Sequence, residues 1–258
     1  MTSYLSENAG AATACPECAG IGLIRKQDAV GNWYSTACPC QLPARIRGEI
    51  SRAGFPGVFR DATLLNFQRT ESNDGPRYMA NRYLEEFIPG PRGPQGVGLL
   101  FHGPVGTGKT HLAVAIAREL IETRGISARF FTIADLLARL RATYSKADGS
   151  ESESEVLKQV FAADLVVIDE LGAVRATDWA FEMQELILGW LYNHARPLLV
   201  TTNLANLGAG ESSKGVSEYA RAAAPETLGD RIGARMFSRL QQMCIPVAFT
   251  GIDWRRRR

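Results

Sequence analysis

Residues 97–110 read VGLLFHGPVGTGKT, a short apolar run that ends in the pattern G-x-x-x-x-G-K-T. Its glycines let successive backbone N–H groups curl around a phosphate, because no Cβ atom blocks the approach. Lys109 supplies a mobile positive charge for the β- and γ-phosphates, and the Thr110 hydroxyl is suited to ligate Mg²⁺. The stretch predicts a loop that binds the phosphates of a nucleoside triphosphate. We expect contacts with the nucleotide from Gly103, Pro104, Val105, Gly106, Thr107, Gly108, Lys109, Thr110 and His111.

The sequence on either side of this loop favours the same interpretation. Residues 97–101 have the composition of a buried strand, and residues 111–123 carry apolar side chains at helical spacing. The N-terminus of such a helix adds its own attraction for anions. The alternative, a glycine-rich turn that binds nothing, does not explain a strand before the loop and a helix after it.

From residue 97 onward, strand-like runs alternate with helical patterns. This alternation is typical of a parallel sheet that is covered by helices. The candidate strands are residues 97–101, 128–132, 165–169, 197–202 and 245–249. We also expect a helix at residues 76–87 and exposed loops at 148–155 and 207–215.

A second part of the nucleotide site is predicted at residues 165–170, which read LVVIDE. Asp169 would hold Mg²⁺, and Glu170 would orient and deprotonate the attacking water. The next candidate strand ends in Val-Thr-Thr-Asn, and Asn203 there is suited to bond the γ-phosphate or the water. The alternative for Asn203 is a strand-terminating residue that caps a turn. Together with the phosphate loop, these residues predict an α/β fold with a P-loop NTPase core, a five-stranded parallel sheet and hydrolysis of a nucleoside triphosphate.

Three arginines, Arg231, Arg235 and Arg239, are spaced four residues apart and so share one face of a predicted helix. A neighbouring subunit could present such a ridge to a γ-phosphate, where a delocalised charge stabilises the transition state. The alternative is a solvated basic face.

Length and composition limit the class of protein. A chain of 258 residues can form one large domain and a small one. It has no apolar run of transmembrane length and no evident signal peptide, so we expect a cytoplasmic protein without a membrane partner. The net charge of +2 argues neither for nor against a nucleic-acid partner.

Four of the five cysteines form two tight pairs, Cys15 with Cys18 and Cys38 with Cys40. In a reducing compartment they are not expected to form disulfides. Four thiolates with a small hairpin between the pairs would hold structural Zn²⁺ and supply folding energy that a short segment lacks. A redox dithiol and unrelated free thiols are the alternatives. The fifth cysteine, Cys244, is expected to pack as a small hydrophobic residue.

These features divide the chain into three predicted parts. Residues 1–52 would form a four-cysteine zinc-binding module, residues 53–96 a linker with an entry helix, and residues 97–258 the ATPase domain.

The motifs together resemble those of the AAA+ ATPases of the DnaC/DnaI helicase-loader and IstB transposition-helper group, over nearly the whole chain. The resemblance rests on both cysteine pairs and on five stretches: GFPGVFRDAT (54–63), GPVGTGKTHLA (103–113), IDELG (168–172), TTN (201–203) and LGDRIGARM (228–236), with a terminal Asp-Trp-Arg. It implies that Asn203 is the sensor 1 residue. Arg235 would be the arginine finger that acts on a neighbouring subunit, with Arg231 as the less favoured choice. Arg255 is similar in position to a basic residue that reads the nucleotide.

The resemblance also implies partners. Such loaders contact single-stranded DNA through a helix after the second strand, a place that residues 133–146 fit. There Arg139, Arg141 and Lys146 would be available for phosphates and Tyr144 for stacking, unless this is an ordinary amphipathic surface helix. The implied function is ATP-dependent self-association and delivery of a replicative DNA helicase, with the zinc module as the helicase contact.

Other functions stay open. One is a transposition helper that serves a transposase on duplex DNA, and another is a nucleotide-gated adaptor whose hydrolysis is vestigial. A small-molecule kinase is disfavoured, because no lid or acceptor-binding pattern is present.

Overall fold

The computed structural model describes residues 15–19, 21–27, 33–88, 98–144, 151–175, 177–213 and 225–256. The chain divides into two compact units, Met1–Gly48 and Glu49–Arg258. The boundaries expected after residues 52 and 96 stay a prediction. Some predicted features lie outside the described residues, namely Val97, Lys146 and residues 148–150 and 214–215.

The first unit contains an antiparallel hairpin. Strand β1 (Leu23–Gln27) pairs with β2 (Trp33–Ala37), so the hairpin predicted between the cysteine pairs is confirmed. A short helix η1 (Pro39–Gln41) follows, and helix α1 (Leu42–Arg52) begins in this unit and ends in the second one. Among this unit's described side chains, the buried hydrophobic ones are Cys18 and Cys38. The hairpin therefore has almost no apolar core to stabilise it.

The second unit is built on a five-stranded sheet in the order β4-β5-β6-β3-β7. Every neighbouring pair is parallel. The strands are β3 (Gly98–His102), β4 (Ala128–Thr132), β5 (Leu165–Asp169), β6 (Leu198–Thr202) and β7 (Cys244–Ala248). All five predicted strands are confirmed, with ends shifted by at most one residue. Both β5 and β6 are buried along their whole length, which explains their uninterrupted apolar runs.

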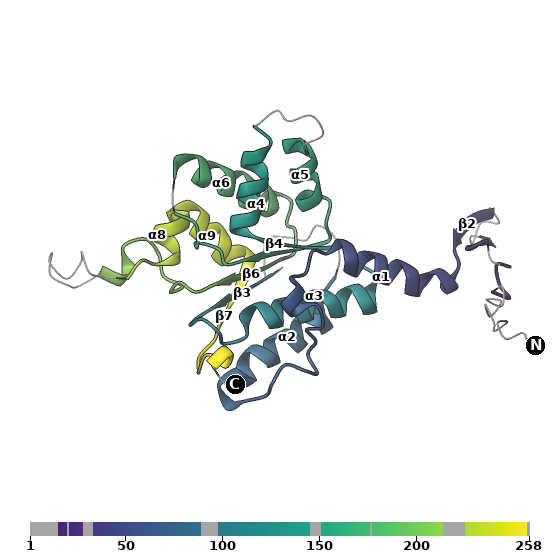
Figure 1. Cartoon of the computed structure of the whole chain (residues 1–258), viewed down its shortest axis with the longest axis horizontal. Coiled ribbons are helices and arrows are strands. Elements are labelled where there is room, and N and C mark those ends of the chain that lie inside the picture. The colour runs from purple at the N-terminus through teal and green to yellow at the C-terminus, as the bar shows by residue number, and fades with distance from the viewer. Residues whose placement is uncertain are drawn as a thin grey trace, which may run out of the picture. The chain divides into compact units, whose positions relative to one another are not determined.

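Helices cover both faces of this sheet, as Figure 1 shows. Helices α2 (Asp74–Glu86) and α3 (Lys109–Arg124) lie on one face. The opposite face carries α4 (Ile133–Ala142), α5 (Glu153–Phe161), α6 (Asp178–Asn193), α8 (Leu228–Ile232) and α9 (Ala234–Met243). Buried sheet side chains such as Leu100, Val166 and Val200 share one core cluster with apolar side chains of this second helical layer. Further short helices are η2 (Gly57–Phe59), η3 (Glu71–Asn73), η4 (Glu211–Ser213) and η5 (Trp254–Arg256).

One loop prediction is wrong in part. The acidic, serine-rich stretch 148–155 was expected to be an exposed loop, but α5 begins at Glu153. The Ser152 hydroxyl accepts a hydrogen bond from the Glu155 N–H, and the Glu155 carboxylate accepts one from the Ser152 N–H. This capping box satisfies N–H groups at the start of the helix. The serines and acids therefore mark a helix start here.

The longest described helices, α3 and α6, have 16 residues each. Within the described part of the chain, no helix combines the length and the apolar character needed to cross a membrane.

Candidate nucleotide site and cysteine cluster

The phosphate loop connects the end of β3 to the start of α3. Gly106 and Gly108 have φ angles of +77° and +98°, in the left-handed region that L-residues avoid. At Gly106 a Cβ atom would lie 1.7 Å from Asp253 Oδ1, so the loop also passes too close to the C-terminal segment for any side chain. Helix α3 begins at Lys109 with no side-chain cap, which leaves its first N–H groups for an anion.

Lys109 is folded against the loop that precedes it. Its Nζ donates to the carbonyl oxygens of Gly103 at 2.8 Å and Pro104 at 2.6 Å, and the residue is only 6% exposed. Burial lowers the pKa of Lys109 to about 8, although the nearby Asp169 carboxylate opposes this shift. Near neutral pH the side chain is still a cation and can bind phosphate.

Asp169 ends β5 and is buried beside Thr110, as the predicted magnesium site requires. Its Oδ1 accepts hydrogen bonds from the Thr110 hydroxyl at 2.9 Å and the Thr201 hydroxyl at 2.5 Å. Burial raises the pKa of Asp169, while both hydroxyls and the charge of Lys109 act in the opposite direction. A buried carboxylate beside a hydroxyl is a hard oxygen donor set, so these two residues fit Mg²⁺.

A single cavity of about 460 Å³ brings the catalytic candidates together. Lys109, Thr110, Glu170 and Asn203 all line it, although three different strands precede them. Asp169 reaches this group through its bond to Thr110. Of the predicted contact residues, Val105 to His111 line the cavity, and Gly103 and Pro104 stand just before them.

The predicted linker before β3 (residues 53–96), called the connector below, contributes one wall of the cavity. The sequence motifs did not predict this wall. Phe59, Asn66, Phe67, Gln68 and Asn73 line it. The GFPGVFRDAT stretch (54–63) and the polar residues after it contain these side chains. No known spacing rule links such residues to a nucleotide, so the sequence did not reveal their position.

His111 joins this connector to the phosphate-loop helix. Its Nε2 lies 3.1 Å from the Thr63 carbonyl oxygen and 3.0 Å from Asn66 Oδ1. Both partners are acceptors, so Nε2 carries the proton. The ring also packs against Phe67 with centroids 5.4 Å apart, and burial lowers the pKa of His111. The predicted nucleotide contact therefore also anchors the connector.

The C-terminal segment closes another side of the cavity. The Trp254 N–H donates to the Gly106 carbonyl oxygen at 3.0 Å, and the Arg255 N–H donates to Asp253 Oδ1 at 3.0 Å. Trp254 and Arg255 both line the cavity. The Arg255 charge lowers the pKa values of Lys109 and Asp169, in each case as a smaller contribution.

The three predicted ridge arginines have different surroundings. Arg231 is held by the Glu226 carboxylate at 2.6 Å and the Val174 carbonyl oxygen at 3.3 Å. Arg239 lies over the Tyr192 ring, 5.2 Å from its centroid. Arg235 pairs with Glu185 at 3.0 Å, yet its side chain is 71% exposed, compared with 22% for Arg231. In the described part of the chain, none of the three lines the cavity.

The helix predicted at residues 133–146 is α4, which ends at Ala142. Its arginines are not equally available. Arg139 donates to Glu151 at 2.8 Å and to Gln159 at 2.9 Å, so a phosphate would have to compete with these two partners.

A cluster of aromatic and basic side chains lies where the C-terminal end of α4 meets the start of α6. Arg141 stacks 4.5 Å from the centroid of Trp179, a residue of α6 that was not predicted for this site. Tyr144 packs edge-on against the same ring and is 58% exposed.

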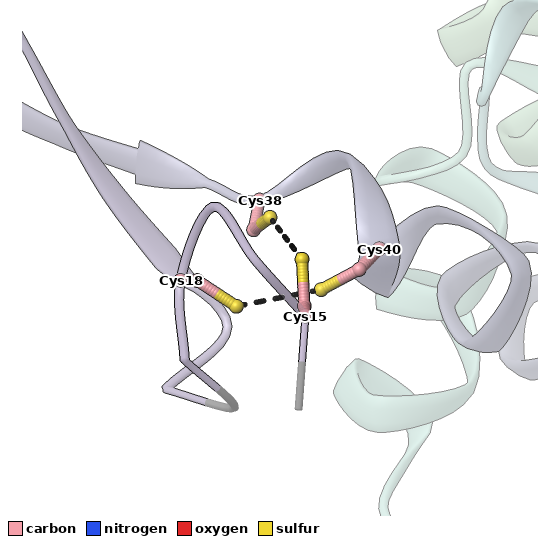
Figure 2. Close-up of side chains that lie close together, drawn as sticks. All are labelled: Cys15, Cys18, Cys38 and Cys40. Carbon is pink, nitrogen blue, oxygen red and sulfur yellow. Dashed lines mark hydrogen bonds between the residues drawn. The ribbon is translucent and has the colours of Figure 1, made fainter. Parts of the chain in front are cut away.

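The four paired cysteines of the first unit form one cluster, shown in Figure 2. All four sulfur atoms lie within 4.8 Å of one another. Cys15 and Cys38 are 3.7 Å apart and Cys18 and Cys40 are 3.6 Å apart, too far for disulfide bonds. Tetrahedral Zn²⁺ with Zn–S bonds near 2.3 Å places its sulfur ligands about 3.8 Å apart. The cluster is therefore compatible with zinc.

Cys244 is separate and buried, as predicted.

Residues 93–210 match the model of the IstB-like ATP binding protein family. The replicative helicase loader DnaC of Escherichia coli (strain K12) is 28% identical over 160 residues, which are 62% of this chain and 62% of that protein. The chain spans 50% to 62% of the length of the curated relatives it matches.

Two solved structures share the fold. The crystal structure of the DnaC helicase loader aligns with a TM-score of 0.59 and 26% identity, covering 76% of this chain and 100% of that one. The crystal structure of DnaI aligns with a TM-score of 0.55 and 22% identity, covering 76% and 95%. The resemblance to DnaC-like AAA+ proteins is confirmed.

The lowered pKa of Lys109 predicts how nucleotide affinity depends on pH. Above about pH 8 the free protein loses the Lys109 proton, which binding to phosphates must restore. We expect the dissociation constant for ATP at pH 9 to be about tenfold higher than at pH 7. Titration with a fluorescent ATP analogue between these values measures this change. In K109A, affinity should be lost at every pH. Equal affinities of the wild type at pH 7 and 9 would show that Lys109 does not titrate in this range.

Proposed function

We propose that this chain, an AAA+ protein similar in sequence and fold to the DnaC and DnaI helicase loaders, delivers a replicative DNA helicase onto single-stranded DNA with the use of ATP. The use of ATP is supported by the cavity in which Lys109, Thr110, Glu170 and Asn203 meet, and the helicase partner by the similarity to the DnaC loader. A purely adaptor function needs nucleotide binding but not a carboxylate such as Glu170 beside the phosphate site. ATP binding would favour self-association and capture of DNA, and hydrolysis would release them.

In the proposed reaction, the phosphate loop and Lys109 hold the β- and γ-phosphates. Thr110 and Asp169 would hold Mg²⁺, which neutralises phosphate charge when bound. Glu170 accepts a proton from the attacking water, and Asn203 orients that water or the γ-phosphate. Catalysis then depends on the positions and charges of groups from this chain, as phosphoryl transfer generally requires.

We assign the trans-acting arginine finger to Arg235. A finger must leave its own subunit and reach the γ-phosphate of a neighbour. Arg231 is tied to Glu226 and to the Val174 carbonyl, and Arg239 covers Tyr192. The Arg235 side chain is more exposed than that of Arg231. Its ion pair with Glu185 lies at the surface, where such pairs are weak.

For single-stranded DNA we propose the cluster of Arg141, Tyr144 and Trp179, in which Arg141 and Tyr144 are exposed and Trp179 is half-buried. Aromatic rings stack with unpaired bases, and a nearby guanidinium attracts the backbone. Trp179 joins the cluster through its ring contacts with both other residues. Arg139 is left out, because Glu151 and Gln159 already hold it.

For the first unit we propose structural Zn²⁺ on the four-cysteine cluster and contact with the helicase. The cluster is closed, with four ligands of one type, as in structural rather than catalytic zinc sites.

The family match also supports a second function, that of an IstB-like helper acting with a transposase on duplex DNA. Both functions use the same ATPase core, so the partner and the form of DNA distinguish them.

Complex formation tests the proposed partner. We expect the purified chain with ATP and single-stranded DNA to co-elute with the cognate replicative helicase in size-exclusion chromatography with light scattering. Binding to duplex DNA without helicase association would instead favour the transposition helper.

Substitution at the arginine ridge tests the finger. R235A should keep its affinity for ATP while hydrolysis falls by roughly 100-fold or more, because the transition state loses a charge. R239A is the matched control, since it removes a residue of the same ridge that packs on its own chain. Steady-state hydrolysis at a chain concentration that permits self-association measures both. Equal rates in R235A and R239A would exclude the assignment.

Metal analysis tests the zinc site. Elemental analysis of protein purified without added metal should give one zinc per chain. In C18S the metal should be lost and the first unit should unfold, since few buried apolar side chains remain to stabilise it. Protease resistance of residues 15–48 reports the folding of this unit. Retained resistance after complete removal of metal would contradict a structural role.

A further inference from the structure

Glu170 has a backbone conformation that is unusual for its residue type. Its φ angle is +57°, in the left-handed region that glycine adopts easily and glutamate does not. Such conformations persist only where surrounding contacts hold them, and they cluster at functional sites. The protein therefore needs both this backbone turn and a carboxylate side chain at the same position.

Thr201, on the adjacent strand β6, supplies two of the hydrogen bonds that hold this turn. The Glu170 N–H donates to the Thr201 hydroxyl at 3.0 Å, and the Leu171 N–H donates to the Thr201 carbonyl oxygen at 2.9 Å. Thr201 thus binds the backbone on both sides of the Glu170 Cα atom. With 2% exposure, it is shielded from water that could replace these bonds.

The same hydroxyl also holds the preceding carboxylate. Thr201 Oγ1 lies 2.5 Å from Asp169 Oδ1. A hydroxyl has one proton to donate, and here it goes to the carboxylate, while a lone pair accepts the Glu170 N–H. One side chain therefore fixes two consecutive acids, of which one is proposed to hold Mg²⁺ and the other to activate water.

We propose that Thr201 is a positioning residue for ATP hydrolysis: its hydroxyl fixes the peptide between Asp169 and Glu170 and so directs the Glu170 carboxylate toward the attacking water. This inference rests on the proposed ATPase function. Thr201 belongs to the TTN stretch (201–203), in which the sequence motifs give a role to Asn203 alone. A small misplacement of a reacting group is enough to slow an enzyme greatly, so the loss of one hydroxyl should be visible in kcat.

Thr202 provides a matched control. It is the next residue of β6, is 1% exposed, and its hydroxyl donates to the Leu171 carbonyl oxygen at 2.8 Å. That hydroxyl also accepts the Leu204 N–H at 3.2 Å. Replacement by valine at either position removes one buried hydroxyl of similar environment, but only T201V frees Asp169 and the Glu170 N–H.

The test compares ATP hydrolysis, ATP affinity and unfolding temperature of the full chain with T201V, T201A, T201S and T202V. We expect kcat to fall about 10- to 100-fold in T201V and T201A, with KM and ATP affinity changed by no more than about threefold. T201S and T202V should keep kcat close to that of the wild type. If T201V does not fold, T201A and T201S still differ by a single oxygen atom and answer the question.

Hydrogen exchange of the Glu170 amide gives a second readout that does not depend on turnover. Exchange should be faster in T201A than in T201S, because only serine retains the acceptor. If the wild type hydrolyses ATP and T201A does so with the same kcat, the inference is overturned. A wild type that does not hydrolyse ATP would refute the proposed ATPase function instead, and equal exchange in T201A and T201S would then overturn the positioning of Glu170 as well.

Discussion

Parallel pairing of β5, β6 and β3 is the constraint on which the second unit depends. It places the carboxyl ends of these three strands at one edge of the sheet. The phosphate loop follows β3, Asp169 ends β5 with Glu170 directly after it, and Asn203 follows β6. Residues separated by almost 100 positions, such as Lys109 and Asn203, therefore meet because of the strand arrangement itself. The usual location of ligand sites in such sheets, at the carboxyl ends of the strands, follows from the same geometry.

The first unit depends on a different interaction. Its hairpin has little buried apolar surface among the described side chains, and Cys18 and Cys38 supply what there is. A segment of this length cannot offset its loss of chain entropy by apolar burial alone. Four converging sulfur atoms are a suitable substitute, because a metal ion that binds them links residues on both sides of the hairpin. Folding and metal binding of this unit would then be one event.

Much of this architecture could be predicted from the sequence because its signals are local. Each strand of the sheet is a short apolar run, and the phosphate loop and the cysteine pairs have fixed spacings. The connector wall around Phe67 and the contact of Trp254 with Gly106 could not be predicted, because both depend on tertiary packing. Thr63 and His111 are 48 positions apart, and Gly106 and Trp254 are 148 positions apart. Helix α5 was missed for another reason: serine and glutamate mark both loops and helix starts. The bond from Arg139 to Glu151, 12 positions along the chain, was not predicted either, because the helical spacing around Arg139 gives no sign of it.

Segments from both ends of the second unit line the nucleotide cavity. His111 links the phosphate-loop helix to the connector at Thr63 and Asn66, and Trp254 links the loop itself to the C-terminal segment. A nucleotide that fills the cavity would thus touch both segments that flank the sheet in sequence, as well as the catalytic groups. The arginine assigned to hydrolysis is absent from this wall and largely exposed. Under the proposed function, one chain would bind the nucleotide by itself, whereas the arginine for the transition state would come from another copy. Hydrolysis would then be coupled to assembly.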